Sequence, residues 1–156
     1  MQCKERLEVY LREQQIPFQV QHHPKAFQAQ QIAEHEHIPG KMVAKVVIAF
    51  ADNKMIALVL PATLRVSLDK ARANLGGKEV RLAHEPEFAA TFPDCEVGTM
   101  PPFGNLYSLP VYVESHLVGQ ETIVFPVGTP TDTMSLRYND FAQLVHPTVM
   151  DFAYTN

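Results

Sequence analysis

The chain has little cysteine, no tryptophan and no long hydrophobic run. Its 156 residues include two cysteines. No stretch approaches the ~20 consecutive apolar residues that a membrane-spanning helix requires. The first six residues also lack the apolar core of a secretory signal peptide. These absences predict a cytoplasmic protein that does not associate with a membrane.

The two cysteines are too few and too far apart in the sequence to indicate a disulfide framework or a zinc site. We therefore expect Cys3 and Cys95 to be reduced thiols. Cys95 is a candidate nucleophile, which leaves a thiol-dependent hydrolase as one alternative. No neighbouring pattern supplies a base, however, so a small buried hydrophobe is the expected role.

Other catalytic patterns are missing as well. His35 and His37 are two residues apart, so they point to different sides of a helix and do not form the His-Glu-x-x-His metal motif. The serines lie in no nucleophile-elbow pattern. Gly76 and Gly77 follow a predicted helix, whereas a phosphate-binding loop precedes one. The sequence therefore predicts neither a metal nor a nucleotide cofactor.

The chain also lacks a surplus of basic residues. It has 13 lysines and arginines against 17 acidic residues, a net charge of −4. Proteins that hold long nucleic acids by their phosphates normally carry a basic surplus. DNA is therefore not an expected partner, and any contact with nucleic acid should be small and local.

Helices and strands are predicted to alternate irregularly along one domain, residues 1–156. Hydrophobic spacing and turn residues predict helices over 4–15, 28–37, 67–76, 85–90 and 139–145, with Asn139 as the cap of the last one. Strands are predicted over 18–23, 43–51, 55–61, 78–83, 110–114, 122–127 and 133–138, with a hairpin turn at 52–54. Because the nearest strands are joined by short turns, we expect an α+β fold with a mixed, largely antiparallel sheet.

The most unusual segment combines rigid and permissive backbone positions. It reads Gly98, Thr99, Met100, Pro101, Pro102, Phe103 and Gly104. Two prolines fix φ and remove two amide donors, while the glycines permit conformations closed to other residues. The segment is either a simple turn or a preordered loop. In the second case it presents the amides of residues 98, 99, 100, 103 and 104 to a ligand.

Lys45 is the second anomaly, since it interrupts an apolar strand over 43–51. Alternation places it on one face with Val43, Val47 and Ala49. Lysine is seldom fully buried, so it either extends to water or binds an anion such as a phosphate.

These two features resemble the YbaK/prolyl-tRNA-synthetase-associated family, whose editing domains hydrolyse mischarged aminoacyl-tRNA. The resemblance spans about residues 7–149. It rests on the strand lysine, on the Gly-x-x-x-Pro pattern of Gly98 and Pro102, and on the order of elements. It implies a sheet curled toward a barrel, surrounded by helices.

The resemblance also implies roles for individual residues. Lys45 would hold the terminal adenosine or its phosphate. The residues from Gly98 to Pro102, with Thr99, Met100 and Pro101 between them, would cradle the aminoacyl group. Phe103, Gly104, Gly128 and Thr129 would line the substrate site. The implied partner is the 3′ acceptor end of mischarged tRNA, with a synthetase as a possible helper.

One departure from the family pattern concerns the stretch at Gly128. Family members often carry a histidine or arginine there, whereas this chain has Thr129-Pro130. Thr129 can donate a hydrogen bond but supplies no charge. The leading hypothesis is a trans-acting aminoacyl-tRNA deacylase that uses neither metal nor cofactor. The alternative is a binding module that recognises a small molecule, an aminoacyl-adenosine or a protein without turnover.

Overall fold

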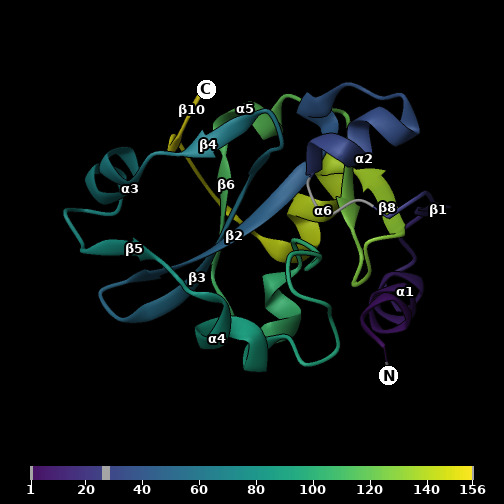
Figure 1. The fold of residues 1–156 in the computed structure, drawn as a ribbon, viewed down its shortest axis with the longest axis horizontal. Coiled ribbons are helices and arrows are strands. Elements are labelled where there is room, and N and C mark those ends of the chain that lie inside the picture. The colour runs from purple at the N-terminus through teal and green to yellow at the C-terminus, as the bar shows by residue number, and fades with distance from the viewer. Residues whose placement is uncertain (1, 26–28, 156) are drawn as a thin grey trace.

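A mixed five-stranded sheet forms the centre of the molecule (Figure 1). The computed structural model describes residues 2–25 and 29–155. Along the sheet the strands are β5 (Val80–Leu82), β2 (Ala44–Ala51), β3 (Lys54–Pro61), β6 (Val111–Glu114) and β9 (Thr148–Met150). Strand β2 is antiparallel to β3 and β5, whereas β6 runs parallel to both β3 and β9.

The hairpin between β2 and β3 is the part of the sheet that the sequence predicts best. Asp52 and Asn53 have φ values of 48° and 68°, both in the left-handed region. A two-residue turn of this kind matches the twist of the flanking strands and is favoured by Asn and Asp. It sets the register from Ala44 opposite Pro61 to Ala51 opposite Lys54.

Two smaller sheets complete the strand arrangement. Strands β1 (Gln19–His22), β8 (Asp132–Arg137) and β7 (Thr122–Pro126) form one, and β10 (Ala153–Thr155) pairs with β4 (Leu64–Val66) in the other. A single parallel bridge between Val43 and Val124 connects β7 to the start of β2. The mixed α+β class is confirmed. The described strands do not close into a barrel, so the expected barrel-like curl is not confirmed.

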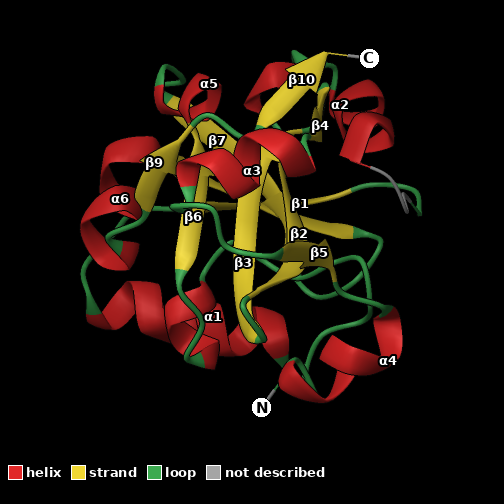
Figure 2. Ribbon diagram, turned by 90° about the vertical axis from the view of Figure 1, so that its left-hand side faces the viewer, coloured by secondary structure: helices red, strands yellow, loops and turns green. Residues whose placement is uncertain are grey.

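Helices surround the strands (Figure 2). They are α1 (Cys3–Glu13), α2 (Ala29–Glu36), α3 (Leu68–Asn74), α4 (Glu85–Phe88), α5 (Ser115–Val118) and α6 (Tyr138–Val145). Three 3-10 turns cover Gly40–Met42, Ala89–Thr91 and Gly104–Tyr107. Within the described residues, no helix is long and apolar enough to cross a membrane.

The helix ends show which local signals decide the boundaries. The Ser67 side chain accepts a hydrogen bond from the Lys70 amide at 3.2 Å and begins α3, as the sequence predicts. The prediction for α6 is wrong, because Arg137 is its N-terminal cap and Asn139 lies inside the first turn. Arg137 is the last residue of β8, so the strand passes directly into the helix and leaves no room for a cap at residue 139.

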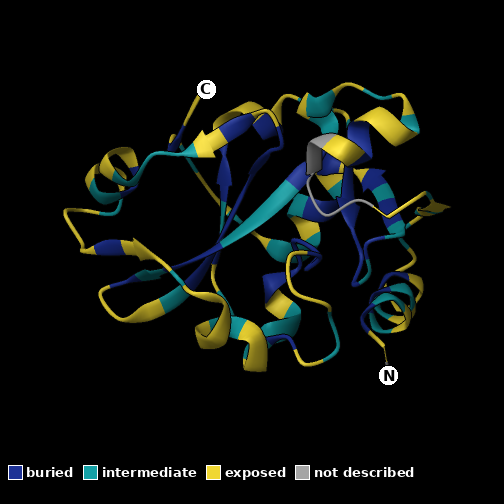
Figure 3. Ribbon diagram, in the orientation of Figure 1, coloured by how far each residue is buried: buried dark blue, intermediate teal, exposed yellow. Residues whose placement is uncertain are grey.

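Much of the central sheet is buried (Figure 3), and apolar side chains pack on both of its faces. Strand alternation sends Ala44 and Ile48 into the larger cluster, together with Met100 and Phe103. Val47 and Ala49 face the other way, against β4 and β10. The two faces of β2 therefore look onto different parts of the molecule.

Candidate functional site

Thr99 ties the start of the 98–104 segment to the turn at Gly128. The Thr99 amide and hydroxyl both donate to the Glu96 carbonyl, at 3.1 and 2.6 Å. The Gly128 amide donates to the Thr99 carbonyl at 2.8 Å, and the Glu96 amide donates to the Gly128 carbonyl at 3.0 Å. The structure thus brings together two stretches, at 98–99 and at 128–129, that the sequence assigns to one site.

The amides of the segment are used differently from what the sequence predicts. The Thr99 amide is bonded to Glu96 and is not available to a ligand, which corrects the expectation. The Gly98 amide donates to no backbone acceptor in residues 2–25 and 29–155. Gly98 is exposed and has a φ of +86°, a conformation that favours glycine. Of the seven residues in this segment, Gly98 alone is exposed.

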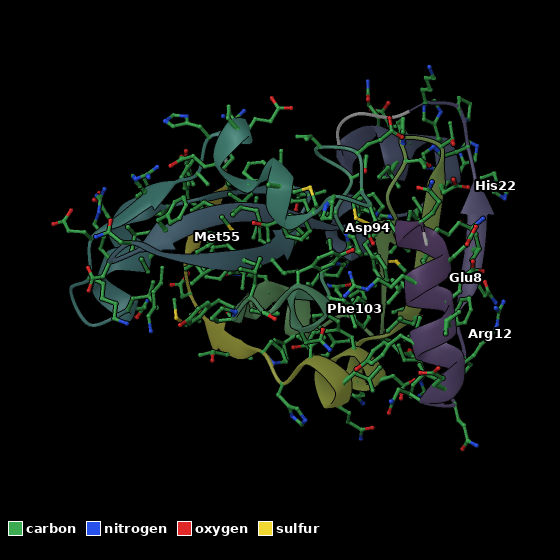
Figure 4. The ribbon with its side chains drawn as sticks, turned by 90° about the horizontal axis from the view of Figure 1, so that it is seen from below. Glu8, Arg12, His22, Met55, Asp94 and Phe103 are labelled. Carbon is green, nitrogen blue, oxygen red and sulfur yellow. A yellow bond between two sulfur atoms is a disulfide. The ribbon has the colours of Figure 1, made fainter. Side chains whose placement is uncertain are left out.

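The rest of the segment is buried. Met100, Pro101 and Pro102 lie against the core. The side chain of Phe103, labelled in Figure 4, is fully buried. Its ring packs against three other rings, those of Tyr10, Phe125 and Phe141.

Gly104 has no room for a side chain, because an added Cβ would lie 2.6 Å from a methyl group of β6. Phe103 and Gly104 therefore lie in the core rather than on a surface that a substrate can reach. Their expected role in the substrate site stays a prediction.

Lys45 lies in β2 opposite Leu60 and is only partly buried. Burial and the nearby charge of Arg65 lower the pKa of its amino group. No acidic side chain of the described chain forms an ion pair with it. No hydrogen bond among the described residues joins Lys45 to the 98–104 segment. Strand alternation also turns Lys45 away from the core cluster that holds Met100 and Phe103.

Gly128 and Thr129 line a cavity of about 410 Å³ between α1 and the turn that precedes β8. The Thr129 hydroxyl donates to Asp132 Oδ2 at 2.7 Å and also accepts from the Thr131 amide. It is therefore engaged in the turn. The other residues that line the cavity are Gln2, Cys3, Lys4, Glu5, Glu8, Asp94, Val127 and Asp132.

The cysteines are joined, which corrects the expectation of two reduced thiols. Cys3 and Cys95 form a disulfide although 92 residues separate them. The Cys3 amide donates to the Asp94 carbonyl at 3.1 Å, so the start of α1 is held beside Cys95. Their spacing in the sequence does not reveal that two residues so far apart lie close together in space. Because its sulfur is bonded to Cys3, Cys95 offers no free thiolate for the thiol-dependent alternative.

Replacement of Cys3 by serine is expected to lower the free energy of unfolding by about 2–4 kcal/mol without reductant, since the crosslink restricts the unfolded chain. Urea unfolding of wild type and variant, each with and without dithiothreitol, measures the effect. The reductant should lower the wild-type midpoint and leave the variant unchanged.

Cys95→Ala should retain activity per folded molecule. A folded but inactive Cys95→Ala protein would favour the thiol mechanism.

Sequence reasoning missed a residue on the cavity wall, Asp94. Asp94 lies close to α1 (Figure 4). Its carboxylate accepts from the Tyr107 hydroxyl at 3.1 Å and lies 3.6 Å from Arg6 Nη1. Burial, followed by the negative charge of Asp94, raises the pKa of Tyr107, which therefore remains the donor. No local pattern marks Asp94, because its partners are distant in the sequence.

A buried histidine side chain and a buried carboxylate also lie together where β1 and α2 end. His23 Nε2 is 3.8 Å from Glu36 Oε2, and their side chains are 3% and 6% exposed. The Thr133 hydroxyl donates to the same carboxylate at 2.6 Å. The His22-His23 pair at a strand end was the available signal, since alternation exposes one and buries the other. In the described ranges, no group of three or more His, Cys, Asp or Glu side chains is arranged to hold a metal ion.

Comparison with solved structures shows a shared fold. A candidate trans-editing enzyme for prolyl-tRNA synthetase aligns with a TM-score of 0.84 at 20% identity, covering 97% of each chain. The hypothetical protein APE2540 gives 0.85 at 17% identity, covering 95% of this chain and 99% of that one. A segment of a protein from Marinobacter aquaeolei VT8 gives 0.73 at 16% identity, covering 94% of this chain and 30% of that one.

At these identities the similarity establishes the fold alone. No curated protein matches the sequence. The match to a family model is more informative, because it covers residues 23–144, from the buried His23 through the 98–104 segment and the turn at Gly128 to α6. The chain belongs to the aminoacyl-tRNA editing domain family.

Proposed function

We propose that this chain hydrolyses the ester bond of mischarged aminoacyl-tRNA in trans. Membership of the editing-domain family supports the substrate class. The observation that carries the proposal is Gly98, which is exposed and whose amide donates to no backbone acceptor among the described residues. Two hydrogen bonds between Gly128 and the neighbouring residues Glu96 and Thr99 hold this part of the chain in place.

The chemistry suits a site that lacks a catalytic triad. An aminoacyl ester is already activated, so a backbone amide that stabilises the developing oxyanion and a positioned water can suffice. The water oxygen bonds to the carbonyl carbon, and the bond from that carbon to the ribose oxygen breaks. The ribose oxygen takes up the proton that the water loses. The products are a free amino acid and uncharged tRNA, and the neighbouring ribose hydroxyl orients the water.

Each of the named residues has a separate role in this mechanism. Gly98 polarises the carbonyl, while Thr99, Met100, Pro101 and Pro102 fix the backbone on which the Gly98 amide depends. Lys45 holds the phosphate of the terminal adenosine. Gly128 and Thr129 close the site as parts of a rigid turn.

The setting follows from the substrate. The chain would act as one domain, residues 1–156, in the cytoplasm where tRNA is charged, and a synthetase would supply the mischarged product. Neither a metal nor a cofactor has a part in this mechanism.

A second candidate is a binding module with the same fold that does not turn over substrate. One observation favours it. Thr129 stands where family members often carry a histidine or arginine, and its hydroxyl is already bonded to Asp132. A panel of mischarged tRNAs, with loss of the ester followed over time, separates the two candidates. Ester loss above the uncatalysed rate supports the deacylase, whereas binding without ester loss supports the module.

Lys45→Ala should weaken deacylation at subsaturating substrate by about 10–150-fold, equivalent to roughly 1.5–3 kcal/mol for a charge-assisted contact. Lys45→Glu should be worse, because it repels the phosphate. Lys54→Ala is the matched control, since Lys54 is an exposed lysine at the far end of the same hairpin. Wild-type kinetics of Lys45→Ala would mean that the side chain only extends to water.

A further inference from the structure

His23 and Glu36 bring an imidazole and a carboxylate together in a buried setting. Their side chains are 3% and 6% exposed, and Nε2 of the histidine is 3.8 Å from Oε2 of the glutamate. His23 Nε2 and Glu36 Oε1 are buried and form no hydrogen bond with any residue that the structure describes. Buried polar atoms are almost always hydrogen-bonded, so the pair is suited to holding a further polar group.

The neighbouring contacts fix both side chains and the tautomer of the histidine. His23 Nδ1 is 2.7 Å from the Pro24 carbonyl oxygen, which can only accept, so Nδ1 carries the hydrogen and Nε2 presents a lone pair. The His35 ring stacks on the His23 ring, with the centroids 6.1 Å apart. The Thr133 hydroxyl donates to Glu36 Oε2 at 2.6 Å. The two atoms without hydrogen bonds are therefore both acceptors on well-packed side chains.

Two acceptors at this spacing suit one water molecule. A polar separation above 3.5 Å is often bridged by a water, and a buried water needs at least two polar partners. A water between His23 and Glu36 would donate one hydrogen to each and keep its oxygen lone pairs free. Neutral histidine accepts a proton near pH 7, and a carboxylate stabilises the imidazolium that forms. The pair thus has the parts of a general base for hydrolysis.

The strand register places this pair on the same face of the strands as Lys45. The parallel bridge joins Val43 to Val124 of β7, and these two side chains pack in one cluster with α2. Lys45 follows Val43 by two residues, and Pro126, which follows Val124 by two, stands opposite Thr133 of β8. Because side chains alternate along a strand, Lys45 and Thr133 point to the face on which α2 packs, beside β8 (Figure 1).

The turn at Gly128 connects this face to the segment that carries Gly98. The His23 amide donates to the carbonyl of Thr131, at the end of that turn, at 2.9 Å. At the start of the turn the Gly128 amide donates to the carbonyl of Thr99, the residue after Gly98. The histidine and the Gly98 segment are therefore attached to opposite ends of one short turn.

We propose that His23 and Glu36 are the acid–base pair of the hydrolytic site. His23 Nε2 accepts a proton from the attacking water while the water oxygen bonds to the ester carbonyl carbon. The bond from that carbon to the ribose oxygen then breaks, and the imidazolium returns the proton to the ribose oxygen. Glu36 orients the water and stabilises the imidazolium. This inference rests on the proposed function, to which it adds the base that Thr129 does not supply.

His23→Gln should lower the rate of ester hydrolysis by about 10²–10⁴-fold, the usual contribution of a general base. Glu36→Gln, which keeps the shape of the side chain, should lower the rate by a smaller factor. His22→Gln and Glu34→Gln are the matched controls and should keep the wild-type rate. His22 is 70% exposed and points to the other side of β1, and Glu34 is an exposed glutamate of α2. Single-turnover hydrolysis of mischarged tRNA measures the rates, and thermal unfolding checks that each variant is folded.

The pH dependence separates catalysis from a structural role. A histidine base acts only when neutral, so the wild-type rate, less the uncatalysed rate, should fall as acid protonates His23. The groups that face its ring are Glu36 and His35 of α2 and the uncharged Thr133 of β8, and Lys45 lies on the same face two strands away. His23→Gln should remove this inflection. Glu36→Gln should move it to lower pH, because the imidazolium loses its counter-charge.

A second substrate distinguishes this inference from the proposed function. p-Nitrophenyl acetate is an activated ester that contains no tRNA. Hydrolysis of mischarged tRNA by His23→Gln at the wild-type rate and with the wild-type pH profile would overturn the acid–base pair and leave the deacylase standing. If no mischarged tRNA is hydrolysed but hydrolysis of p-nitrophenyl acetate depends on His23 and not on His22, the deacylase proposal fails and the pair stands. A wild-type protein that hydrolyses neither ester would overturn both.

Discussion

Gly98→Val is expected to lower the rate of ester hydrolysis by about 10²–10³-fold, the usual cost of losing one oxyanion donor. Gly98 has a φ of +86°, where valine is strained, although no atom lies within 4 Å of an added Cβ. Relief of that strain rotates the peptide plane and moves the amide. Single-turnover hydrolysis of the preferred mischarged tRNA measures the change.

Gly76→Val is the matched control. Gly76 has a φ of +75° and open space around its Cβ position, so it carries the same backbone strain at the end of α3. Both variants should lose similar stability, but only Gly98→Val should lose activity.

Pro102→Ala should also slow hydrolysis more than it lowers stability, because it loosens the loop. Wild-type rates in folded Gly98→Val and Pro102→Ala would reduce the segment to a simple turn.

Phe103→Ala should lower the free energy of unfolding by about 3–5 kcal/mol, the range for removal of a fully buried aromatic ring. The Phe103 ring contacts those of Tyr10, Phe125 and Phe141, which belong to α1, β7 and α6. The cavity left behind would therefore affect elements on several sides. Urea unfolding with a free fit of the slope gives the loss.

Phe88→Ala provides the comparison for this effect. Phe88 ends the short helix α4 and is only partly buried, so the same truncation there should cost clearly less. An equal or smaller loss for Phe103→Ala would show that the 98–104 segment is not part of the folded core.

Local chemistry explains which parts of the fold could be predicted. The β2–β3 hairpin follows from a turn of Asp52 and Asn53 between apolar runs, and α3 follows from Ser67 before it and glycines after it. Strands β4, β9 and β10 have only three residues each, too few to show a period. Pairing with distant strands, rather than their own sequence, decides their conformation.

The candidate site likewise has parts that the sequence predicts and parts that it does not. The glycines and prolines at 98–102 and the lysine at 45 are local anomalies, so the sequence marks them. The link from Thr99 to Gly128 and the disulfide from Cys3 to Cys95 are approaches between remote parts of the chain. The sequence also gives no sign that Phe103 turns inward, because an aromatic residue after two prolines suits a ligand pocket and a core equally well.

The pairing of β10 with β4 also determines when this small sheet can form during synthesis. During synthesis β4 (Leu64–Val66) leaves the ribosome long before β10 (Ala153–Thr155), and domains tend to fold from the N-terminal side as they emerge. Until Tyr154 is in place, β4 has an open edge and Arg65 stands alone. The two-stranded sheet of β4 and β10 therefore forms only after β10 has been synthesised.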